Sequence, residues 1–236
     1  MKKGEPWNRR GFLKTTGGVL ITLAAQGSPD RAVSAEGESR PAKRDPAQLR
    51  RLLEEMESKG SRFWSVPRKD GEFLNLMVKA TRARNVLELG TSHGYSAIWI
   101  GLGLEETNGR LTTIEIDAER HDLARRHVAE AALSERVTLV RGDAHRELAR
   151  IEGPFDFVFI DADKEGQVDY FNKLHPKKLV PGGILMVHNA IRQASSMQDY
   201  LSMIRKNPDF DTVILSATMD DGFCVSYRHR TSPVSP

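Results

Sequence analysis

Hydrophobic and polar residues follow two patterns along this chain: short apolar segments, and longer segments with apolar residues at helical spacing. The short segments are rich in β-branched and aromatic residues, and they predict strands at residues 85–89, 111–116, 137–140, 155–160, 183–188, 212–215 and 223–228. The longer segments predict helices at residues 46–58, 68–81, 95–104, 118–133, 145–151, 168–179 and 195–206. Several strands are apolar on both faces, which is typical of a parallel sheet covered by helices.

From residue 85 onward the predicted strands and helices alternate, and this order predicts an α/β fold, a Rossmann-like three-layer sandwich. Right-handed crossovers between parallel strands place helices on both faces of such a sheet. Ligands bind beyond the carboxyl ends of the strands, where the strand order reverses. We expect the two helices that precede the first strand to cover this binding site.

Residues 1–35 have the three parts of an export signal. A basic start with Arg9 and Arg10 precedes a weakly apolar segment at 17–25, and small residues lie before Glu36, where signal peptidase is expected to cut. The paired arginines followed by GFLK resemble a twin-arginine (Tat) signal, which routes folded proteins across the bacterial inner membrane.

The chain therefore divides into a Tat-type signal peptide at 1–35, a solvated linker at 36–45 and one domain of ordinary size at 46–236. Export to the periplasm is expected if the signal is used, and the alternative is a cytoplasmic protein with a basic tail. Residues 1–35 hold six of the 35 basic residues and two of the 32 acidic ones, which leaves 29 basic and 30 acidic residues. The domain thus lacks the basic surplus of a nucleic-acid-binding surface, and its single Cys224 excludes an internal disulfide.

The first strand leads into ELGTSHGYS at 88–96, in which Gly90 comes directly after the strand. Glycine allows a sharp turn and the close approach of a ligand to the main chain. A dinucleotide-binding loop has the pattern G-x-G-x-x-G, but Ser92 and Tyr95 stand at its second and third glycine positions. The loop therefore argues against a nicotinamide cofactor and suits a smaller one.

Polar residues also follow the next four strands. Glu115 ends the second strand, where a carboxylate can accept both hydroxyls of a ribose, whereas Asp117 fits the N-cap of the next helix. The other strand-end candidates are Asp143 and Ala144, then Asp161, Asp163 and Lys164, and finally His188 and Asn189. Asp143 also fits a helix cap, and Lys164 also fits a surface lysine paired with Asp163 or Glu165. Because the carboxyl ends of parallel strands meet at one edge, we expect these residues to converge on one cleft.

Taken together, the strand ends resemble the cation-dependent, catechol-type O-methyltransferases. The matching segments are ELGTSHGYS at 88–96, Glu115, GDA at 142–144, FIDADK at 159–164 and PGGILMVHN at 181–189. The resemblance extends from about Trp64 to Tyr227 and keeps the order of the family's motifs. It implies a mostly parallel seven-stranded sheet with a reversed last hairpin, S-adenosylmethionine as the methyl donor, and a small hydroxylated acceptor that is usually aromatic.

The resemblance also implies roles for individual residues. The methionine and loop side of the donor site would be lined by Val66, Glu88, Gly90, Ser92 and Ser96. Glu115 would hold the ribose, and the adenine would be bordered by Ile116 and Ala144, with Asp143 close by. Asp161 would touch the donor and ligate a divalent metal, and Lys164 would take the proton of the acceptor hydroxyl. A phenol has a pKa of about 10, so a cation and a base both help to make its oxygen anionic for in-line methyl transfer.

One position departs from the family's pattern. The family adds an Asp-Asn pair to the aspartate after the fourth strand, whereas this chain has His188-Asn189. The predicted metal set is therefore Asp161, His188 and Asn189, and the imidazole nitrogen favours manganese, iron, nickel or zinc over magnesium. Two alternatives stay open: His188 is a base or acceptor-binding group without a metal, or it only hydrogen-bonds a neighbouring strand end.

The leading hypothesis is an S-adenosylmethionine-dependent O-methyltransferase that acts on a small phenolic or catechol hydroxyl with the help of a metal and Lys164. The alternatives are a non-catalytic, exported S-adenosylmethionine-binding protein and a nicotinamide-dependent oxidoreductase. The expected partners are the small acceptor and the Tat export machinery, with no nucleic acid, and a homodimer is left open. Because S-adenosylmethionine is made in the cytosol, export would separate the domain from its methyl donor.

Overall fold

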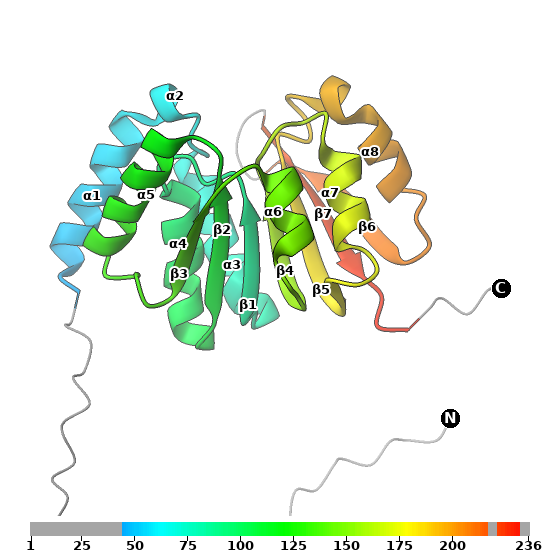
Figure 1. Ribbon diagram of the computed structural model, residues 1–236, viewed down its shortest axis with the longest axis horizontal. Coiled ribbons are helices and arrows are strands. Elements are labelled where there is room, and N and C mark those ends of the chain that lie inside the picture. The colour runs from blue at the N-terminus through cyan, green and yellow to red at the C-terminus, as the bar shows by residue number, and fades with distance from the viewer. Residues whose placement is uncertain (1–43, 217–220, 232–236) are drawn as a thin grey trace, which may run out of the picture. The chain divides into compact units, whose positions relative to one another are not determined.

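The computed structural model describes residues 44–216 and 221–231, and these form one seven-stranded sheet with helices on both faces (Figure 1). The strands are β1 (Asn85–Leu89), β2 (Arg110–Glu115), β3 (Val137–Arg141), β4 (Phe155–Ile160), β5 (Leu179–His188), β6 (Phe210–Leu215) and β7 (Phe223–Arg228). The helices are α1 (Pro46–Ser58), α2 (Gly60–Phe63), α3 (Arg68–Thr81), α4 (Tyr95–Thr107), α5 (Ala118–Glu130), α6 (Ala144–Arg150), α7 (Gln167–Leu174), the 3₁₀ helix η1 (Ala194–Met197) and α8 (Gln198–Ile204). The predicted α/β three-layer fold is confirmed.

Where the elements differ from the predicted ones, the cause is local. The helix predicted at 168–179 ends at Leu174, because Pro176 disfavours helical backbone at the residue before it and cannot donate a backbone hydrogen bond. Leu179 instead begins β5, and the helix predicted at 195–206 divides into η1 and α8. The four residues of α2 are too few to produce a periodic pattern, so the sequence does not predict this helix.

The sheet has the strand order β3-β2-β1-β4-β5-β7-β6. Neighbouring strands are parallel except at β7, which is antiparallel to both β5 and β6. The predicted seven-stranded sheet with a reversed last hairpin is therefore confirmed. The chain leaves β1 toward β2 on one side, and β4 lies on the other, so the strand order reverses between β1 and β4. Ligand sites in open α/β sheets lie at the carboxyl ends of such strands.

The two faces of the sheet carry separate apolar cores, and β4 shows how one strand serves both. Phe157 and Phe159 pack in the cluster that includes α1, α3 and α4. Phe155, Val158 and Ile160 belong to the cluster that includes α6, α7 and α8. Side chains alternate between the faces of a strand, so a strand covered on both faces is apolar at nearly every position. In β4 the exception is Asp156, which accepts hydrogen bonds from Arg84 N and Asn85 N, and the register shifts between Phe155 and Phe157.

The predicted signal peptide at 1–35 and residues 36–43 of the predicted linker lie outside the described residues. The last two linker residues are part of the folded domain. Arg44 forms an ion pair with Glu105 at 2.7 Å, and the Asp45 side chain accepts a hydrogen bond from Ala47 N and caps α1. Among the described residues, no helix is long and apolar enough to cross a membrane.

Helices α3 and α4 pack closely because glycines lie at their contact. A Cβ atom added to Gly71 of α3 would lie 2.2 Å from Cδ1 of Trp99 on α4. A Cβ atom on Gly103 of α4 would lie 3.0 Å from Val78 of α3. Asn75 Nδ2 also donates a hydrogen bond to the Trp99 carbonyl at 2.9 Å. The position of α3 against the sheet therefore depends on residues without a side chain.

We expect Gly71→Ala to lower the free energy of unfolding by about 1–3 kcal/mol, because the added methyl group would overlap the Trp99 ring. Urea denaturation followed by circular dichroism measures this change. Gly60→Ala is the matched control, since a Cβ atom there meets nothing closer than Ser65 Cβ at 3.5 Å. Equal denaturation midpoints for the two variants would contradict the close packing.

Candidate functional site

A cavity of about 960 Å³ opens at the carboxyl ends of the parallel strands. Its walls come from the loops after β1, β2, β3, β4 and β5, and from the segment around α2. Every predicted site residue except Glu88 lines this cavity, including the members that lie farthest apart in the sequence, Val66 and Asn189. The expected convergence of the strand ends on one cleft is therefore confirmed, although lining a cavity does not test the role of each residue.

The loop after β1 is held against the end of β4. Gly90 has a φ of +88°, and a Cβ atom there would lie 2.6 Å from the Asp161 carbonyl oxygen, so only glycine fits. Ser92 N donates a hydrogen bond of 2.7 Å to Glu115 Oε2, which ties the same loop to the end of β2. The loop thus lines the cavity between two strand ends.

Glu115 and Asp117 have the separate roles that the sequence suggests. The Glu115 carboxylate accepts hydrogen bonds from Ser92 N and from Asp117 N, the latter at 3.0 Å, and lines the cavity. The Asp117 side chain accepts from Arg120 N at 2.9 Å and caps α5. Asp143 also proves to be a helix cap, because its side chain accepts from His145 N at the start of α6.

Glu88 lies below the cavity floor and is fully buried. Its Oε2 accepts a hydrogen bond from Thr113 Oγ1 at 2.5 Å, whereas Oε1 accepts none among the described residues. Burial raises the pKa of this carboxyl to about 7, although hydrogen bonds to Ser96 and Thr113 oppose the shift. A buried acceptor oxygen without a partner is unusual in a folded protein.

Lys164 and Asp161 form a buried ion pair at the end of β4. Lys164 is only 8% exposed, and its Nζ donates to Asp161 Oδ1 at 2.7 Å. The interpretation of Lys164 as a surface lysine paired with Asp163 or Glu165 is therefore wrong. Burial alone would raise the pKa of Asp161, but the positive charges of Lys164 and His188 hold it well below its ordinary value.

The His188 imidazole lies between two carboxylates. Its Nδ1 faces Asp161 Oδ1 at 3.3 Å, and its Nε2 faces Asp70 Oδ2 at 2.8 Å. Burial disfavours the charged imidazole, but the nearby Asp161 and the hydrogen bond to Asp70 raise the pKa of His188 to about 9. The structure thus brings Asp161 and His188 of the predicted metal set together.

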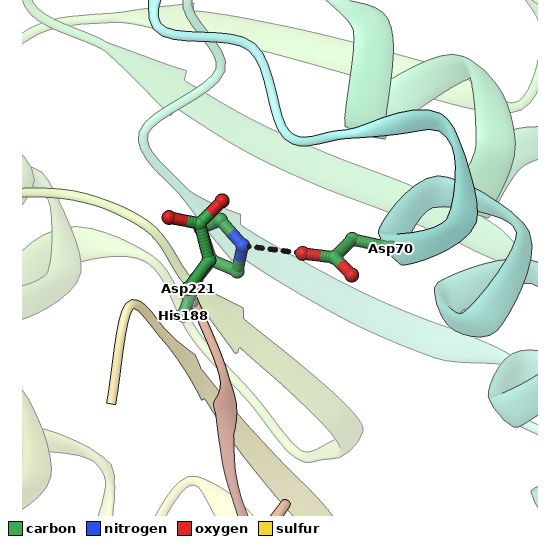
Figure 2. A group of neighbouring side chains, drawn as sticks. All are labelled: Asp70, His188 and Asp221. Atoms are coloured by element: carbon green, nitrogen blue, oxygen red, sulfur yellow. Dashed lines mark hydrogen bonds and ion pairs between the residues drawn. The ribbon is translucent and has the colours of Figure 1, made fainter. Parts of the chain in front are cut away.

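Asn189, the third predicted ligand, is turned toward a different residue. Its φ is +61°, and its Nδ2 donates a hydrogen bond of 3.3 Å to Asp221 Oδ1. Asp221 in turn lies near His188 and Asp70, as Figure 2 shows, and ligand atoms of these three side chains lie within 4.8 Å of one another. The group around His188 therefore contains two carboxylates that the predicted metal set lacks.

Asp70 and Asp221 are both absent from the predicted site residues. Asp70 is the more distant of the two from His188 in the chain. It belongs to α3, is 0% exposed, and lies 118 residues before His188 in the chain. One sequence signal does point to it, because Asp70 stands at the same helical face as Leu74 and Val78, which are both buried. An acidic residue on the apolar face of a predicted helix is a candidate for a buried functional group.

Trp64 lies at the rim of the cavity. The ring is 76% exposed and lines the cavity, and the Arg120 guanidinium lies 4.6 Å from the centre of the ring. Ile116, predicted to border the adenine, is also exposed and lines the cavity. An exposed apolar rim of this kind suits the binding of an aromatic ligand.

The stability of the domain should depend on pH through Glu88. The pKa of Glu88 is about 7 in the folded protein, above its ordinary value of 4.5, so the folded state binds this proton more tightly. The resulting stabilisation is complete below the ordinary pKa and is lost as the pH rises through 7. We expect Glu88→Gln to show a smaller fall in unfolding free energy between pH 5 and 8, measured by urea denaturation without ligand. Parallel pH profiles for the two proteins would refute this expectation.

Comparisons with known proteins agree with this geometry. A sequence model of a family described as O-methyltransferase matches residues 38–214. A catechol O-methyltransferase of Niastella koreensis is 36% identical over 140 residues, which are 57% of this chain and 62% of that protein. A catechol O-methyltransferase of Mycobacterium tuberculosis is 33% identical over 171 residues, which are 67% of this chain and 77% of that protein. The chain thus spans less than two thirds of the first of these relatives.

A solved structure extends the similarity to three dimensions. The O-methyltransferase from Bacillus cereus, solved in complex with SAH, superimposes with a TM-score of 0.69 at 28% sequence identity. The superposition covers 78% of this chain and 91% of the Bacillus cereus protein. The family match over most of the chain and the similarity to a cofactor-bound structure show that this chain belongs to the family of S-adenosylmethionine-dependent O-methyltransferases.

Proposed function

We propose that this protein transfers the methyl group of S-adenosylmethionine to a hydroxyl of a small phenolic acceptor of the catechol type. The observation that carries the proposal is the buried amine of Lys164, which lies against Asp161 in the same cavity as the loop after β1. The names of the relatives, two of them catechol O-methyltransferases, support the choice of acceptor.

The residues of the cavity fit the donor. Gly90, Ser92 and Ser96 line the cavity and would hold the methionine part of the donor. Each Glu115 oxygen accepts one backbone hydrogen bond and retains a lone pair for a ribose hydroxyl. The apolar side chains of Ile116 and Ala144 would then border the adenine.

Lys164 would act as the base. In its neutral amine form, reached when the ammonium of the ion pair releases a proton to solvent, Lys164 Nζ takes the proton of the acceptor hydroxyl, and the freed oxygen lone pair forms the bond to the methyl carbon. The carbon–sulfur bond of the sulfonium breaks at the same time, and the electron pair stays on sulfur, which becomes a neutral thioether. Asp161 holds Nζ in place by the 2.7 Å hydrogen bond, so the base is positioned before the acceptor arrives.

A divalent cation would assist this reaction, and the chemistry of the residues around His188 fits one. Imidazole nitrogen and carboxylate oxygen together suit manganese, iron, nickel or zinc better than magnesium, which prefers oxygen ligands. The predicted set of Asp161, His188 and Asn189 places two of its three side chains within 3.3 Å of each other. When bound, such a cation favours the anionic form of the acceptor oxygen.

Methyl transfer from labelled donor to a panel of catechols and phenols tests the proposal, with manganese, zinc or magnesium added. We expect Lys164→Met to lower turnover by about 10²–10⁴-fold, because general-base catalysis is lost. Affinity for S-adenosylhomocysteine, measured by calorimetry, should change little. Lys173→Met is the matched control, since Lys173 pairs with Asp169 and does not line the cavity. Turnover of Lys164→Met equal to that of the control, or no transfer by the unaltered protein, would refute the proposal.

We also propose that residues 1–35 direct the folded protein through the Tat pathway. The support is the order of paired arginines, apolar segment and small residues before Glu36. Cell fractionation with a carboxyl-terminal tag should find a product that begins at Glu36 in the periplasm. A full-length protein confined to the cytoplasm would contradict export and would place the domain beside its donor.

A further inference from the structure

The His188 imidazole is oriented from both of its nitrogen atoms. It is 3% exposed, so both nitrogens depend on protein partners rather than water. Nδ1 faces Asp161, whose charge is already balanced by Lys164 at 2.7 Å. Nε2 faces Asp70, which is fully buried at the start of α3. A carboxylate behind one ring nitrogen fixes the tautomer and directs the other nitrogen outward, as in many protein metal sites.

Asp221 completes a group of three potential ligands around the His188 ring. One ligand atom each from Asp70, His188 and Asp221 lies within 4.8 Å of the others, and Figure 2 shows the three side chains converging. Ligand atoms that sit about 2.0–2.2 Å from one ion lie roughly 3–4 Å apart. A small adjustment of the side chains therefore brings all three onto a single ion.

The charges of this group match a dication. Asp70 and Asp221 contribute two negative charges, and the ion pair of Asp161 with Lys164 is neutral by itself. The Arg192 side chain approaches Asp221 at 3.3 Å, but it is 68% exposed and lies at the solvent side. Buried carboxylates are stable only when a cation or strong hydrogen bonds offset their desolvation. One divalent ion would displace the proton of His188 Nε2, and the ion with two carboxylates and the then neutral imidazole leaves the group uncharged.

We propose that Asp70, His188 and Asp221 are the direct ligands of a divalent transition-metal ion, with His188 coordinating through Nε2. Asp161 is then a positioning residue, which accepts a hydrogen bond from His188 Nδ1 and does not touch the ion. Asn189 positions Asp221 through the 3.3 Å hydrogen bond. This ligand set replaces two of the three predicted ligands and recruits α3, and its role in methyl transfer rests on the proposed function.

Replacement of single residues by cysteine tests which side chains touch the ion. A thiolate bound directly to Co²⁺ gives a charge-transfer band in the near ultraviolet, whereas a thiolate outside the coordination shell gives none. The full chain is chelated, dialysed against Co²⁺ and analysed for bound metal. We expect one Co²⁺ per chain, and the band in Asp70→Cys and Asp221→Cys but not in Asn189→Cys. Cys224, the single natural cysteine, is buried and present in every sample, so the unaltered protein provides the baseline.

The outcomes separate this proposal from the proposed function. Absence of bound Co²⁺ in the unaltered protein would overturn the metal site. A band in Asn189→Cys and in neither aspartate variant would overturn the ligand set in favour of Asp161, His188 and Asn189. Binding of S-adenosylhomocysteine by each variant shows that it is folded, and Asp221→Cys provides a second ligand test should the buried Asp70→Cys fail to fold. Bands in the expected variants, together with no methyl transfer by the unaltered protein, would refute the proposed function alone.

Discussion

The burial of Asp161 is the constraint on which the rest of the site depends. This aspartate directly follows β4, and its backbone N donates to the Leu89 carbonyl at 2.8 Å, so the ends of β4 and β1 are joined there. Its carbonyl oxygen leaves room only for glycine at position 90. The Asp161 side chain is only 16% exposed, and a carboxylate so largely shielded from water is stable only with positive partners. Lys164 and His188 supply them, and each is thereby placed at the floor of the cavity.

The substitution of histidine for the family's aspartate at position 188 has a consequence beyond the loss of one charge. An imidazole has two nitrogen atoms that can both carry a proton, so His188 can contact the Asp161 and Asp70 carboxylates at once, which an ionised carboxylate cannot do because it has no proton to donate. The second contact ties α3 to the carboxyl end of β5. Glycines at the contact of α3 with α4 allow this helix to lie close enough, so the active-site chemistry and the helix packing are linked.

The proposed methyl transfer and the proposed export would make different demands on the protein. The Tat pathway carries proteins that are already folded, and a donor molecule enclosed in the cavity could travel with the domain, but one molecule supports a single turnover. Most residues proposed to hold the donor line the same cavity as His188 and Asp221, whereas Glu88 and Asp70 do not line it. The compartment in which the methyl donor and the metal meet would therefore decide whether the protein catalyses repeated methyl transfer.

The local pattern of the sequence determined the sheet, the order of its strands along the chain and the residues at their carboxyl ends. Apolar strands, the glycine at position 90 and the caps at Asp117 and Asp143 depend on neighbours within a few residues, so they can be predicted without a structure. The resemblance of motifs then identified the family. Helix α2 was harder to predict, because four residues are too few to show a helical spacing of apolar positions. The end of α7 was harder to predict, because Pro176 stops the helix although the apolar pattern continues beyond it.

Only the tertiary structure decided what surrounds His188. Asp70 lies 118 residues away in the sequence, and no local pattern relates a residue on the first turn of α3 to the end of β5. The direction of the Asn189 side chain and the position of Asp221 depend in the same way on how residues 221 and 222, directly before β7, lie against the end of β5. Side-chain contacts between distant segments arise from packing, which sums many weak contacts over the whole domain. For this reason the sequence determined which residues line the cavity, whereas the packing of α3 and of the β7 segment decided which of them meet.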